Sequence, residues 1–331
     1  MTPEQSVYTA IPAVATTMSE PRHVAMFDAV IDVIVLGGGP AGLTAATYLR
    51  RFHRSCLVID AGDSRARWIP ESNNCPGFPN GVSGVELLRR MRQQATEFGT
   101  QFESQLVDRV ELSDGVFTLS SGSRSWRAHR VILATGISDR LPDAPWVEEA
   151  VACHALRLCS ICDAYEASDS RIGVYGPLAD IATHGLFLRS YSEQVFLLPS
   201  DDAEGESALL EAKAAGVRVL EHGGTLGFDG SRCSYTLGDG RVELFDSVYP
   251  FLGADTSAGI VAGLGAALSE KGELLVDRHQ MTTVPGLYAI GDIVSGLNQI
   301  SVAVGQAALA ATHLHNALPF APRISRGAKD T

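Results

Sequence analysis

Short apolar runs that end in glycine or in an acidic residue recur along this sequence. The first, residues 31–36, is followed by GGGPAG at 37–42 and then by Leu43, Ala46 and Leu49, which share one side of a helix. An apolar run of this kind suits a strand that is buried on both faces of a parallel sheet. The pattern therefore predicts a strand, a tight turn and a helix in immediate succession.

The glycines of this turn are spaced for the binding of a dinucleotide. Gly37 allows the tight turn, Gly39 lets a pyrophosphate approach the backbone, and Gly42 lets the helix pack closely on the strand. The anion would sit at the helix N-terminus. A second apolar run ends at Asp60, 18 residues past Gly42, where an acid would hold ribose hydroxyls. The candidate dinucleotide-binding residues of this segment are Gly37, Gly39, Pro40, Ala41, Gly42 and Asp60.

A similar alternation of strand and helix patterns returns in the middle of the chain. It predicts strands at 171–175 and 194–198, with a helix at 180–189 between them. The segments 109–126 and 231–244 are expected to add β-structure beside the main sheets. The fold class expected is α/β, with two three-layer, Rossmann-like dinucleotide-binding domains, the second inserted in the first.

The composition narrows the class of protein. A chain of 331 residues that is 45% hydrophobic and 19% charged is long enough for about two domains. The net charge of −12 argues against a general nucleic-acid-binding protein, and no apolar run approaches the roughly 20 residues that cross a bilayer. Residues 1–27 lack the pattern of a secretory signal, and we interpret them as a mobile extension or as the product of a start codon upstream of Met26. Six scattered cysteines do not form the framework of a secreted protein, so we expect a cytoplasmic location.

Two of these cysteines lie one turn apart in CSICD at 159–163, a motif that allows a zinc clip, an inert structural pair or a redox disulfide. Zinc would need two more ligands at matched spacing, but Cys153 and His154 lie six and five residues before Cys159 and no second CxxC exists, so we expect no metal site. A CxxC at a helix start suits redox chemistry because backbone N–H groups and the helix dipole stabilise a thiolate. Asp163 directly follows the pair and can carry the proton that thiol–disulfide exchange leaves behind.

The last part of the chain carries a more specific pattern. LYAIGDIV at 287–294 is a short apolar strand that ends in Gly291-Asp292, and it precedes Gln299-Ile300 and a helix of small residues. This stretch resembles the second flavin signature of flavoproteins with two dinucleotide-binding domains, in which the matching Asp bonds the ribityl chain of FAD. ILATG at 132–136 resembles the signature that closes the first flavin segment. The resemblance implies FAD as the cofactor and adds Ala134, Thr135, Gly136, Gly291, Asp292, Gln299 and Ile300 to the candidate cofactor-binding residues.

Taken with CSICD, these motifs resemble those of the low-molecular-weight thioredoxin reductases over about residues 28–318. The resemblance implies a homodimeric enzyme whose partner is a thioredoxin-like protein, with Cys162 facing the flavin, Cys159 attacking the external disulfide and Asp163 as acid. It also implies a domain rotation, which Gly136 and Gly253 would permit. The domains expected are an extension at 1–27, a discontinuous FAD-binding domain at 28–140 and 254–318, an inserted NAD(P)-binding-like domain at 141–253 that carries the CxxC, and a tail at 319–331.

The inserted segment departs from the thioredoxin reductase pattern at the nicotinamide site. GPLADI at 176–181 keeps only the first glycine of the fingerprint, and Pro177 removes a backbone donor. Leu178 and Ile181 add side chains where a pyrophosphate would approach and a helix would pack. The following strand ends in Asp201-Asp202, which would repel the 2′-phosphate of NADPH. We therefore expect neither NADPH nor NADH to bind tightly.

Loss of the nicotinamide site leaves four functions open. The leading one is a thioredoxin-reductase-like flavoenzyme that reduces a protein disulfide with electrons from a ferredoxin-type or other donor. The second is an NAD(P)H-dependent thioredoxin reductase. The third is an oxidase that closes dithiols, including those of small molecules, and gives the electrons to oxygen. The fourth is a flavin redox sensor that does not turn over.

Three further features bear on partners and packing. Basic clusters at 50–54 and 89–92 would suit an acidic electron carrier, although we favour a solvated helix face. An aromatic residue of the tail, Phe320, would cover the flavin of its own or a neighbouring chain, although we favour a disordered end. WIPESNNCPGFP at 68–79 is similar to the flavin-contacting loop of the thioredoxin reductases, and we expect its Cys75 to be a buried small residue.

Overall fold

The first predicted strand, β1 (Ile31–Leu36), lies inside a seven-stranded sheet, with strands on both sides of it. In spatial order the sheet contains β3 (Gln101–Glu103), β2 (Cys56–Ile59), β1, β6 (Arg124–Leu133), β5 (Val116–Ser121) and β4 (Arg109–Ser113). β3, β2, β1 and β6 run parallel, whereas β4, β5 and β6 form an antiparallel meander, which is the β-rich segment expected here. The last strand of the chain, β16 (Leu287–Ala289), pairs in parallel with the second half of β6. This pairing brings the two flavin-like signatures to the same end of the sheet.

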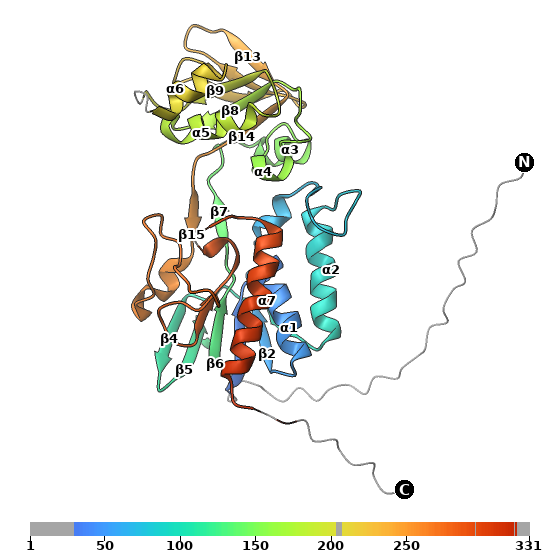
Figure 1. The fold of residues 1–331 in the computed structure, drawn as a ribbon, viewed down its shortest axis with the longest axis vertical. Helices are drawn as coiled ribbons and strands as arrows, with labels where there is room; N and C mark the ends of the chain where they lie inside the picture. The colour runs from blue at the N-terminus through green and yellow to red at the C-terminus, as the bar shows by residue number, and fades with distance from the viewer. Residues whose placement is uncertain (1–29, 203–206, 295, 321, 323–331) are drawn as a thin grey trace, which may run out of the picture.

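One face of this sheet is covered by helices and the other by loops and the meander. Helices α1 (Pro40–Arg51) and α7 (Ile300–Ala317) pack on the first face and on each other, beside α2 (Gly84–Glu97) (Figure 1). Fully buried alanines fill the contact, so the two helices approach closely. On the other face, η2 (Ala258–Leu264) and Phe117 of the meander pack with Ile34 and Leu57 in one buried cluster. β1 is therefore buried on both faces, as its apolar run predicts.

A second, parallel sheet lies at the other end of the molecule. It contains β10 (Arg218–Val219), β9 (Val195–Pro199), β8 (Ile172–Gly176) and β14 (Ser247–Pro250). Helices α5 (Leu178–Leu188) and α6 (Ser207–Ala214) pack on one face. On the other face lie α3 (Val147–Ala152) and an antiparallel sheet of β11 (Thr225–Phe228), β12 (Cys233–Thr236) and β13 (Val242–Phe245). The middle of the chain thus forms a three-layer unit of its own, as predicted.

Two antiparallel strands connect the two units. β7 (Ile137–Asp139) leaves the first sheet and β15 (Ala254–Thr256) returns to it, and the two pair along their whole length (Figure 1). Glycines with positive φ, Gly136 at +65° and Gly253 at +84°, precede the two strands. We propose that the domain boundaries fall at this connection, at 140/141 and 253/254.

The computed structural model describes residues 30–202, 207–294, 296–320 and 322. The predicted extension at 1–27 and most of the tail lie outside the described residues. Within the described ranges, no helix is both long and apolar enough to cross a membrane.

Candidate active site

The GGGPAG turn joins β1 to α1, and its glycines are pressed against neighbouring backbone. Gly37 has φ of +112°, and a Cβ on it would lie 2.3 Å from the carbonyl oxygen of Ala134. A Cβ on Gly42 would lie 2.0 Å from the carbonyl oxygen of Gly37. Neither position has room for a side chain, so the sequence requires glycine at both.

A cavity of about 340 Å³ extends from this turn to the CSICD motif, between the two sheet units. Gly42 is packed behind the turn and is the one candidate residue that does not line the cavity. The candidate residues that do line it are Gly37, Gly39, Pro40, Ala41, Asp60, Ala134, Thr135, Gly136, Cys159, Cys162, Asp163, Gly291, Asp292, Gln299 and Ile300. The segments that sequence analysis singled out separately therefore meet around one cavity.

Two carboxylates lie along the part of the cavity next to the glycine turn. Asp60 Oδ1 accepts a hydrogen bond of 3.0 Å from the backbone N–H of Gly38. Asp292, in η3 (Gly291–Ile293), pairs through Oδ2 with Arg65 Nη1 at 3.1 Å. Burial raises the pKa of the Asp292 carboxyl, and the charge of Arg65 opposes that shift. Arg65, in η1 (Arg65–Trp68), also forms two hydrogen bonds, of 2.6 and 3.0 Å, to Asp139 of the connecting strand β7.

These features fit FAD. Gly37 and Gly39 leave the backbone open to a pyrophosphate at the N-terminus of α1, where helix N–H groups lack intrahelical partners. Asp60 lies at the end of β2, where it could accept from ribose hydroxyls. Apolar side chains such as Leu36, Ile59 and Ile300 line the same cavity.

The cysteines of CSICD form a disulfide at the start of a short helix, α4 (Ser160–Asp163). Cys159 occupies the N-cap position, and its Sγ accepts a hydrogen bond of 3.2 Å from the backbone N–H of Cys162. Both cysteines are half-buried, whereas Ile161 between them is 52% exposed. The disulfide therefore lies at the start of a helix, as the sequence predicts.

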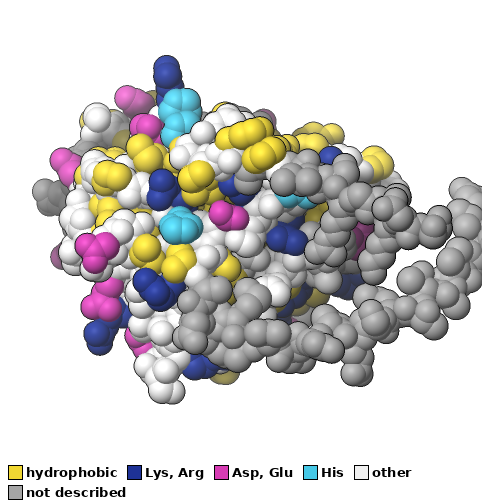
Figure 2. All heavy atoms as spheres, turned by 90° about the horizontal axis from the view of Figure 1, so that it is seen from below, with side chains coloured by type: hydrophobic (Ala, Val, Ile, Leu, Met, Phe, Trp, Pro, Cys, Tyr) yellow, Lys and Arg dark blue, Asp and Glu magenta, His cyan; other side chains and the backbone are white. Residues whose placement is uncertain are grey.

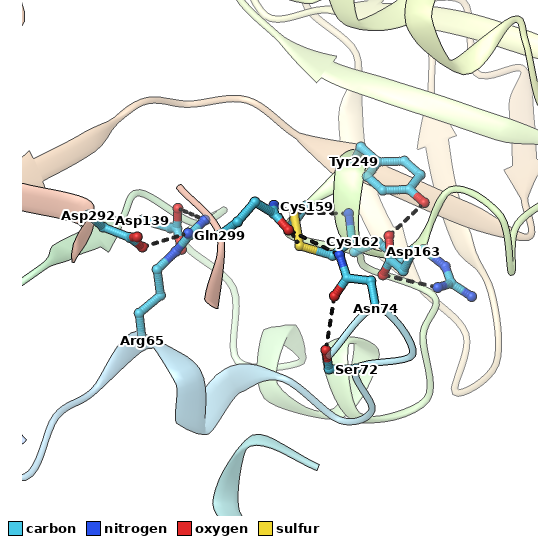
Figure 3. Close-up of a disulfide and its surroundings, with 11 residues drawn as sticks. Arg65, Ser72, Asn74, Asp139, Cys159, Cys162, Asp163, Tyr249, Asp292 and Gln299 are labelled. Atoms are coloured by element: carbon cyan, nitrogen blue, oxygen red, sulfur yellow. Dashed lines mark hydrogen bonds and ion pairs between the residues drawn. A yellow bond between two sulfur atoms is a disulfide. The ribbon is translucent and has the colours of Figure 1, made fainter. Parts of the chain in front are cut away.

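Gln299 connects this disulfide to the opposite wall of the cavity. Its Nε2 lies 3.4 Å from Cys159 Sγ and 3.3 Å from Cys162 Sγ (Figure 3). Its Oε1 accepts a hydrogen bond of 3.0 Å from Asn74 Nδ2, and Asn74 Oδ1 accepts one of 3.1 Å from Ser72 Oγ. Gln299, a candidate cofactor-binding residue, lines the cavity, and its side-chain amide contacts the disulfide.

Asp163 is held by two side chains that sequence analysis did not single out. Its Oδ2 lies 3.0 Å from Arg157 Nη1, and its Oδ1 accepts a hydrogen bond of 2.9 Å from the hydroxyl of the fully buried Tyr249 (Figure 3). Burial raises the pKa of the Asp163 carboxyl, while Arg157 and Tyr249 oppose that shift. Burial also raises the pKa of Tyr249, so its hydroxyl stays protonated and donates.

The other described cysteines are free thiols. Cys75 is buried against Val82 and Leu87, and burial raises its pKa, so the prediction of a buried small residue is confirmed. Cys56 and Cys233 are buried as well, and desolvation raises the pKa of each thiol to about 12. Cys153 is exposed. Among the residues that the structure describes, no cluster of three or more His, Cys, Asp or Glu side chains could hold a metal ion.

The inserted sheet has an altered version of the glycine turn. Gly176 has φ of +152°, and a Cβ on it would lie 2.4 Å from the carbonyl oxygen of Phe251. Asp201 Oδ1 accepts a hydrogen bond of 2.9 Å from the N–H of Leu178, the first residue of α5. His184 stacks on Phe251, with ring centroids 3.4 Å apart. A carboxylate of the chain itself thus lies at the helix N-terminus, where the pyrophosphate of a dinucleotide would bind.

The basic clusters are engaged in contacts within the chain. Arg54 is 7% exposed and donates to His315 and to the carbonyl oxygen of Pro319, while Arg50 donates to the carbonyl oxygen of Phe98. Arg89 and Arg90 both pair with Glu86 on the same helix. At the end of the molecule opposite the inserted sheet, basic side chains are scattered among acidic and apolar ones (Figure 2). These contacts favour the structural interpretation over a docking site for an acidic carrier.

The hypothesis that Phe320 covers the flavin of its own chain is wrong. Gln299 and Ile300, at the start of α7, line the cavity, and Phe320 follows the other end of this 18-residue helix. A helix of that length spans about 27 Å. Phe320 is 89% exposed there.

Comparisons with known proteins agree with this geometry. The family model described as pyridine nucleotide-disulphide oxidoreductase matches residues 31–185 and 187–307. A thioredoxin reductase of Mycolicibacterium smegmatis is 30% identical over 276 residues, which cover 80% of this chain and 88% of that protein. A thioredoxin reductase of Listeria innocua serovar 6a is 28% identical over 301 residues, 85% of this chain and 92% of that one. Among solved structures, HlmI superposes with a TM-score of 0.80 at 28% identity and covers 87% of this chain and 92% of that chain.

Proposed function

Because the chain belongs to the pyridine nucleotide-disulphide oxidoreductase family, we propose that it is a thioredoxin-reductase-like enzyme that reduces a protein disulfide through Cys159 and Cys162. The fold is that of two Rossmann-like domains, and the family binds FAD. The observation that carries the proposal is the cavity, which the glycine turn and the disulfide line together.

FAD is proposed to lie along the glycine turn, with Gly37, Gly39, Pro40 and Ala41 at its pyrophosphate. Asp60 would hold ribose hydroxyls and Asp292 the ribityl chain, as the motif resemblance implies. When bound, FAD supplies a two-electron redox couple next to the disulfide. Thr135, Gly136 and Ile300 complete the wall around it.

The cysteines then perform two exchanges. After reduction of the pair, the Cys159 thiolate attacks one sulfur of the partner disulfide, which forms a mixed disulfide and releases the other partner sulfur. Asp163 gives that sulfur a proton. Cys162 next loses its proton and attacks Cys159 of the mixed disulfide, which restores the Cys159–Cys162 bond and releases the second partner sulfur, and that sulfur takes up the proton. In balance, the partner disulfide gains two electrons and two protons.

The electron donor is proposed to be something other than a tightly bound nicotinamide, such as a ferredoxin-type protein. The contact between Asp201 and the N-terminus of α5 supports this proposal. The carboxylate would repel a pyrophosphate at that position, and the altered turn would hinder its approach to the backbone. The basic clusters do not add support for an acidic donor. An NAD(P)H-dependent thioredoxin reductase is the alternative that this contact disfavours.

The same contact favours one alternative function, a dithiol oxidase. In that case the substrate dithiol loses two electrons and two protons and closes to a disulfide, and oxygen accepts them to give hydrogen peroxide. This direction of flow also needs no nicotinamide. A flavin sensor that does not turn over has no contact in the described residues that favours it.

A thioredoxin-like protein is the proposed partner, since the curated relatives described above are thioredoxin reductases. We also propose a homodimer and a cytoplasmic location.

A stoichiometric transfer experiment tests the proposed function. The FAD-bound protein is reduced anaerobically with one equivalent of dithionite and mixed with oxidised thioredoxin, and the new thioredoxin thiols are alkylated and counted by mass spectrometry. We expect about one thioredoxin disulfide to open per reduced protein, none with Cys159→Ser, and the wild-type yield with Cys153→Ser, the exposed cysteine outside the pair. An unreduced thioredoxin beside fully reduced Cys159 and Cys162 would contradict the proposal. Hydrogen peroxide formed from added dithiols in air would favour the oxidase.

A further inference from the structure

The side chain of Gln299 is aimed at both sulfurs of the disulfide from a different part of the fold. Gln299 is the N-cap residue of α7 on the first sheet, whereas Cys159 and Cys162 belong to α4 beside the second sheet. The amide nitrogen lies 3.4 and 3.3 Å from the two sulfurs, within the range of N–H donors to sulfur.

The orientation of this amide is set by a chain of hydrogen bonds behind it. Asn74 donates to Gln299 Oε1 at 3.0 Å, and the Asn74 oxygen is in turn fixed by Ser72 Oγ at 3.1 Å. Ser72 is buried and pairs with Val82 through two backbone hydrogen bonds, of 2.8 and 3.1 Å. Because Asn74 presents its NH₂ group to Gln299, the oxygen of Gln299 faces Asn74 and its NH₂ group faces the sulfurs.

We propose that Gln299, oriented by Asn74, is a catalytic residue that stabilises the thiolate formed when the Cys159–Cys162 disulfide opens. An intact disulfide is a weak acceptor, whereas a thiolate is a charged one, so the hydrogen bond strengthens as the bond between the sulfurs breaks. The inference rests on the proposed function, since it takes this pair to be the redox centre. Asn74 and Ser72 are positioning residues.

The contacts also favour one of the two sulfurs. Cys159 Sγ accepts from the N–H of Cys162 at 3.2 Å as well as from Gln299, whereas the contact of Cys162 Sγ is with Gln299. Two donors stabilise a charge better than one, so the thiolate rests on Cys159. That is the sulfur proposed to attack the partner.

The electron and proton balance of the opening is simple. In the test below, a dithiol such as dithiothreitol supplies two electrons and two protons and leaves as its cyclic disulfide. Cys162 keeps one proton as a thiol, and the other goes to solvent when Cys159 remains a thiolate.

The other charged and titratable side chains that line the cavity stay constant in the test. They are Asp60, Asp63, Arg65, Glu71, His154, Arg157, Asp163 and Asp292. None of them is altered by the substitutions described next.

The test measures alkylation of Cys159 by iodoacetamide against pH in the FAD-bound protein after reduction, with mass spectrometry to separate Cys159 from Cys162. In Gln299→Leu the donor is lost, and we expect the pKa of the Cys159 thiol to rise by about one unit, which slows alkylation about tenfold at a pH below both pKa values. In Asn74→Asp the new carboxylate accepts from the Gln299 amide and turns its oxygen toward the sulfurs. We expect this variant to raise the thiol pKa at least as much, although Gln299 is retained.

Asn73→Asp is the matched control. The substitution adds the same charge one residue away, at an exposed side chain that contacts Glu71 rather than Gln299. The inference is overturned if Gln299→Leu titrates as wild type, or if Asn74→Asp and Asn73→Asp shift the thiol equally. Should Gln299→Leu fail to fold, the comparison of the two aspartate variants decides alone. The alkylation measurement needs no protein substrate. Its result therefore does not depend on whether the protein reduces thioredoxin.

Discussion

Asp201 Oδ1 lies 2.9 Å from the backbone nitrogen of Leu178 and accepts its hydrogen bond at the first residue of α5. In a dinucleotide-binding unit, that position belongs to the pyrophosphate. The chain has placed a carboxylate of its own there, on a residue 23 positions further along. The inserted unit keeps the architecture of a nicotinamide domain, with this contact at the N-terminus of α5.

The contact predicts a stabilising role for Asp201. Asp201→Ala removes an acceptor and a negative charge from the N-terminus of α5, so we expect the free energy of unfolding to fall by about 1 kcal/mol in urea denaturation. Asp202→Ala, at the exposed neighbour, should change it by less than about 0.5 kcal/mol. Equal effects of the two substitutions would show that the Leu178 contact contributes nothing.

Gly42 gives a prediction about the flavin site. Gly42→Ala places a Cβ 2.0 Å from the carbonyl oxygen of Gly37, so the turn must move away from its present course. We expect a loss of bound FAD after purification and a destabilisation of about 1–3 kcal/mol. The matched control is Gly305→Ala in α7, where no atom beyond the local helix backbone lies within 4 Å of the added Cβ. Since alanine is the better helix former, that variant should keep its FAD and gain about 0.5–1 kcal/mol.

Asp163 gives a prediction about pH. An acid must be protonated to act, and burial raises the pKa of Asp163, which extends the protonated form to higher pH than for an ordinary aspartate. The contribution of Asp163 is therefore full below its raised pKa and is lost as the pH rises through it. Asp163→Asn should reduce disulfide turnover by about 10²–10⁴ and remove this pH dependence, measured as kcat/KM between acidic and neutral pH.

Two further variants separate this role from a structural one. Tyr249→Phe removes a donor to the ionised carboxylate, so the pKa of Asp163 should rise further and the pH profile should move to higher pH by up to about one unit. Glu148→Gln, at an exposed acid of α3 whose charge is not among those that shift the pKa of Asp163, should leave kcat/KM nearly unchanged. An Asp163→Asn variant with wild-type turnover across the pH range would exclude Asp163 as the acid.

The sequence predicted the parts of the fold and the site that follow from local rules. The run at 31–36 and the glycines after it specify a strand, a turn and a helix because apolar burial, positive φ and close backbone contact act over a few residues. CSICD was likewise predicted as a disulfide at a helix start. In both motifs, residue types within a few positions of one another determine the local structure.

What the sequence did not predict are contacts between residues that lie far apart in the chain. Gln299 meets Cys159 across 140 positions, and Tyr249 meets Asp163 across 86. A glutamine before a helix or a tyrosine in an apolar strand gives no local signal of such a partner. Arg157 is the one missed partner that the sequence could have suggested, because it is a basic residue six positions before Asp163.

The central claim is a flavin-linked disulfide centre that is not supplied by a tightly bound nicotinamide. The most direct test is an anaerobic titration of the FAD-bound protein with NADPH and with NADH, followed by the visible absorption of oxidised flavin, with dithionite as the positive control. We predict that neither nicotinamide bleaches the flavin at stoichiometric concentration, whereas dithionite bleaches it and thiols appear on Cys159 and Cys162. Rapid, stoichiometric bleaching by NADPH or NADH would contradict the account, because it would mean that the inserted unit still admits a nicotinamide despite Asp201.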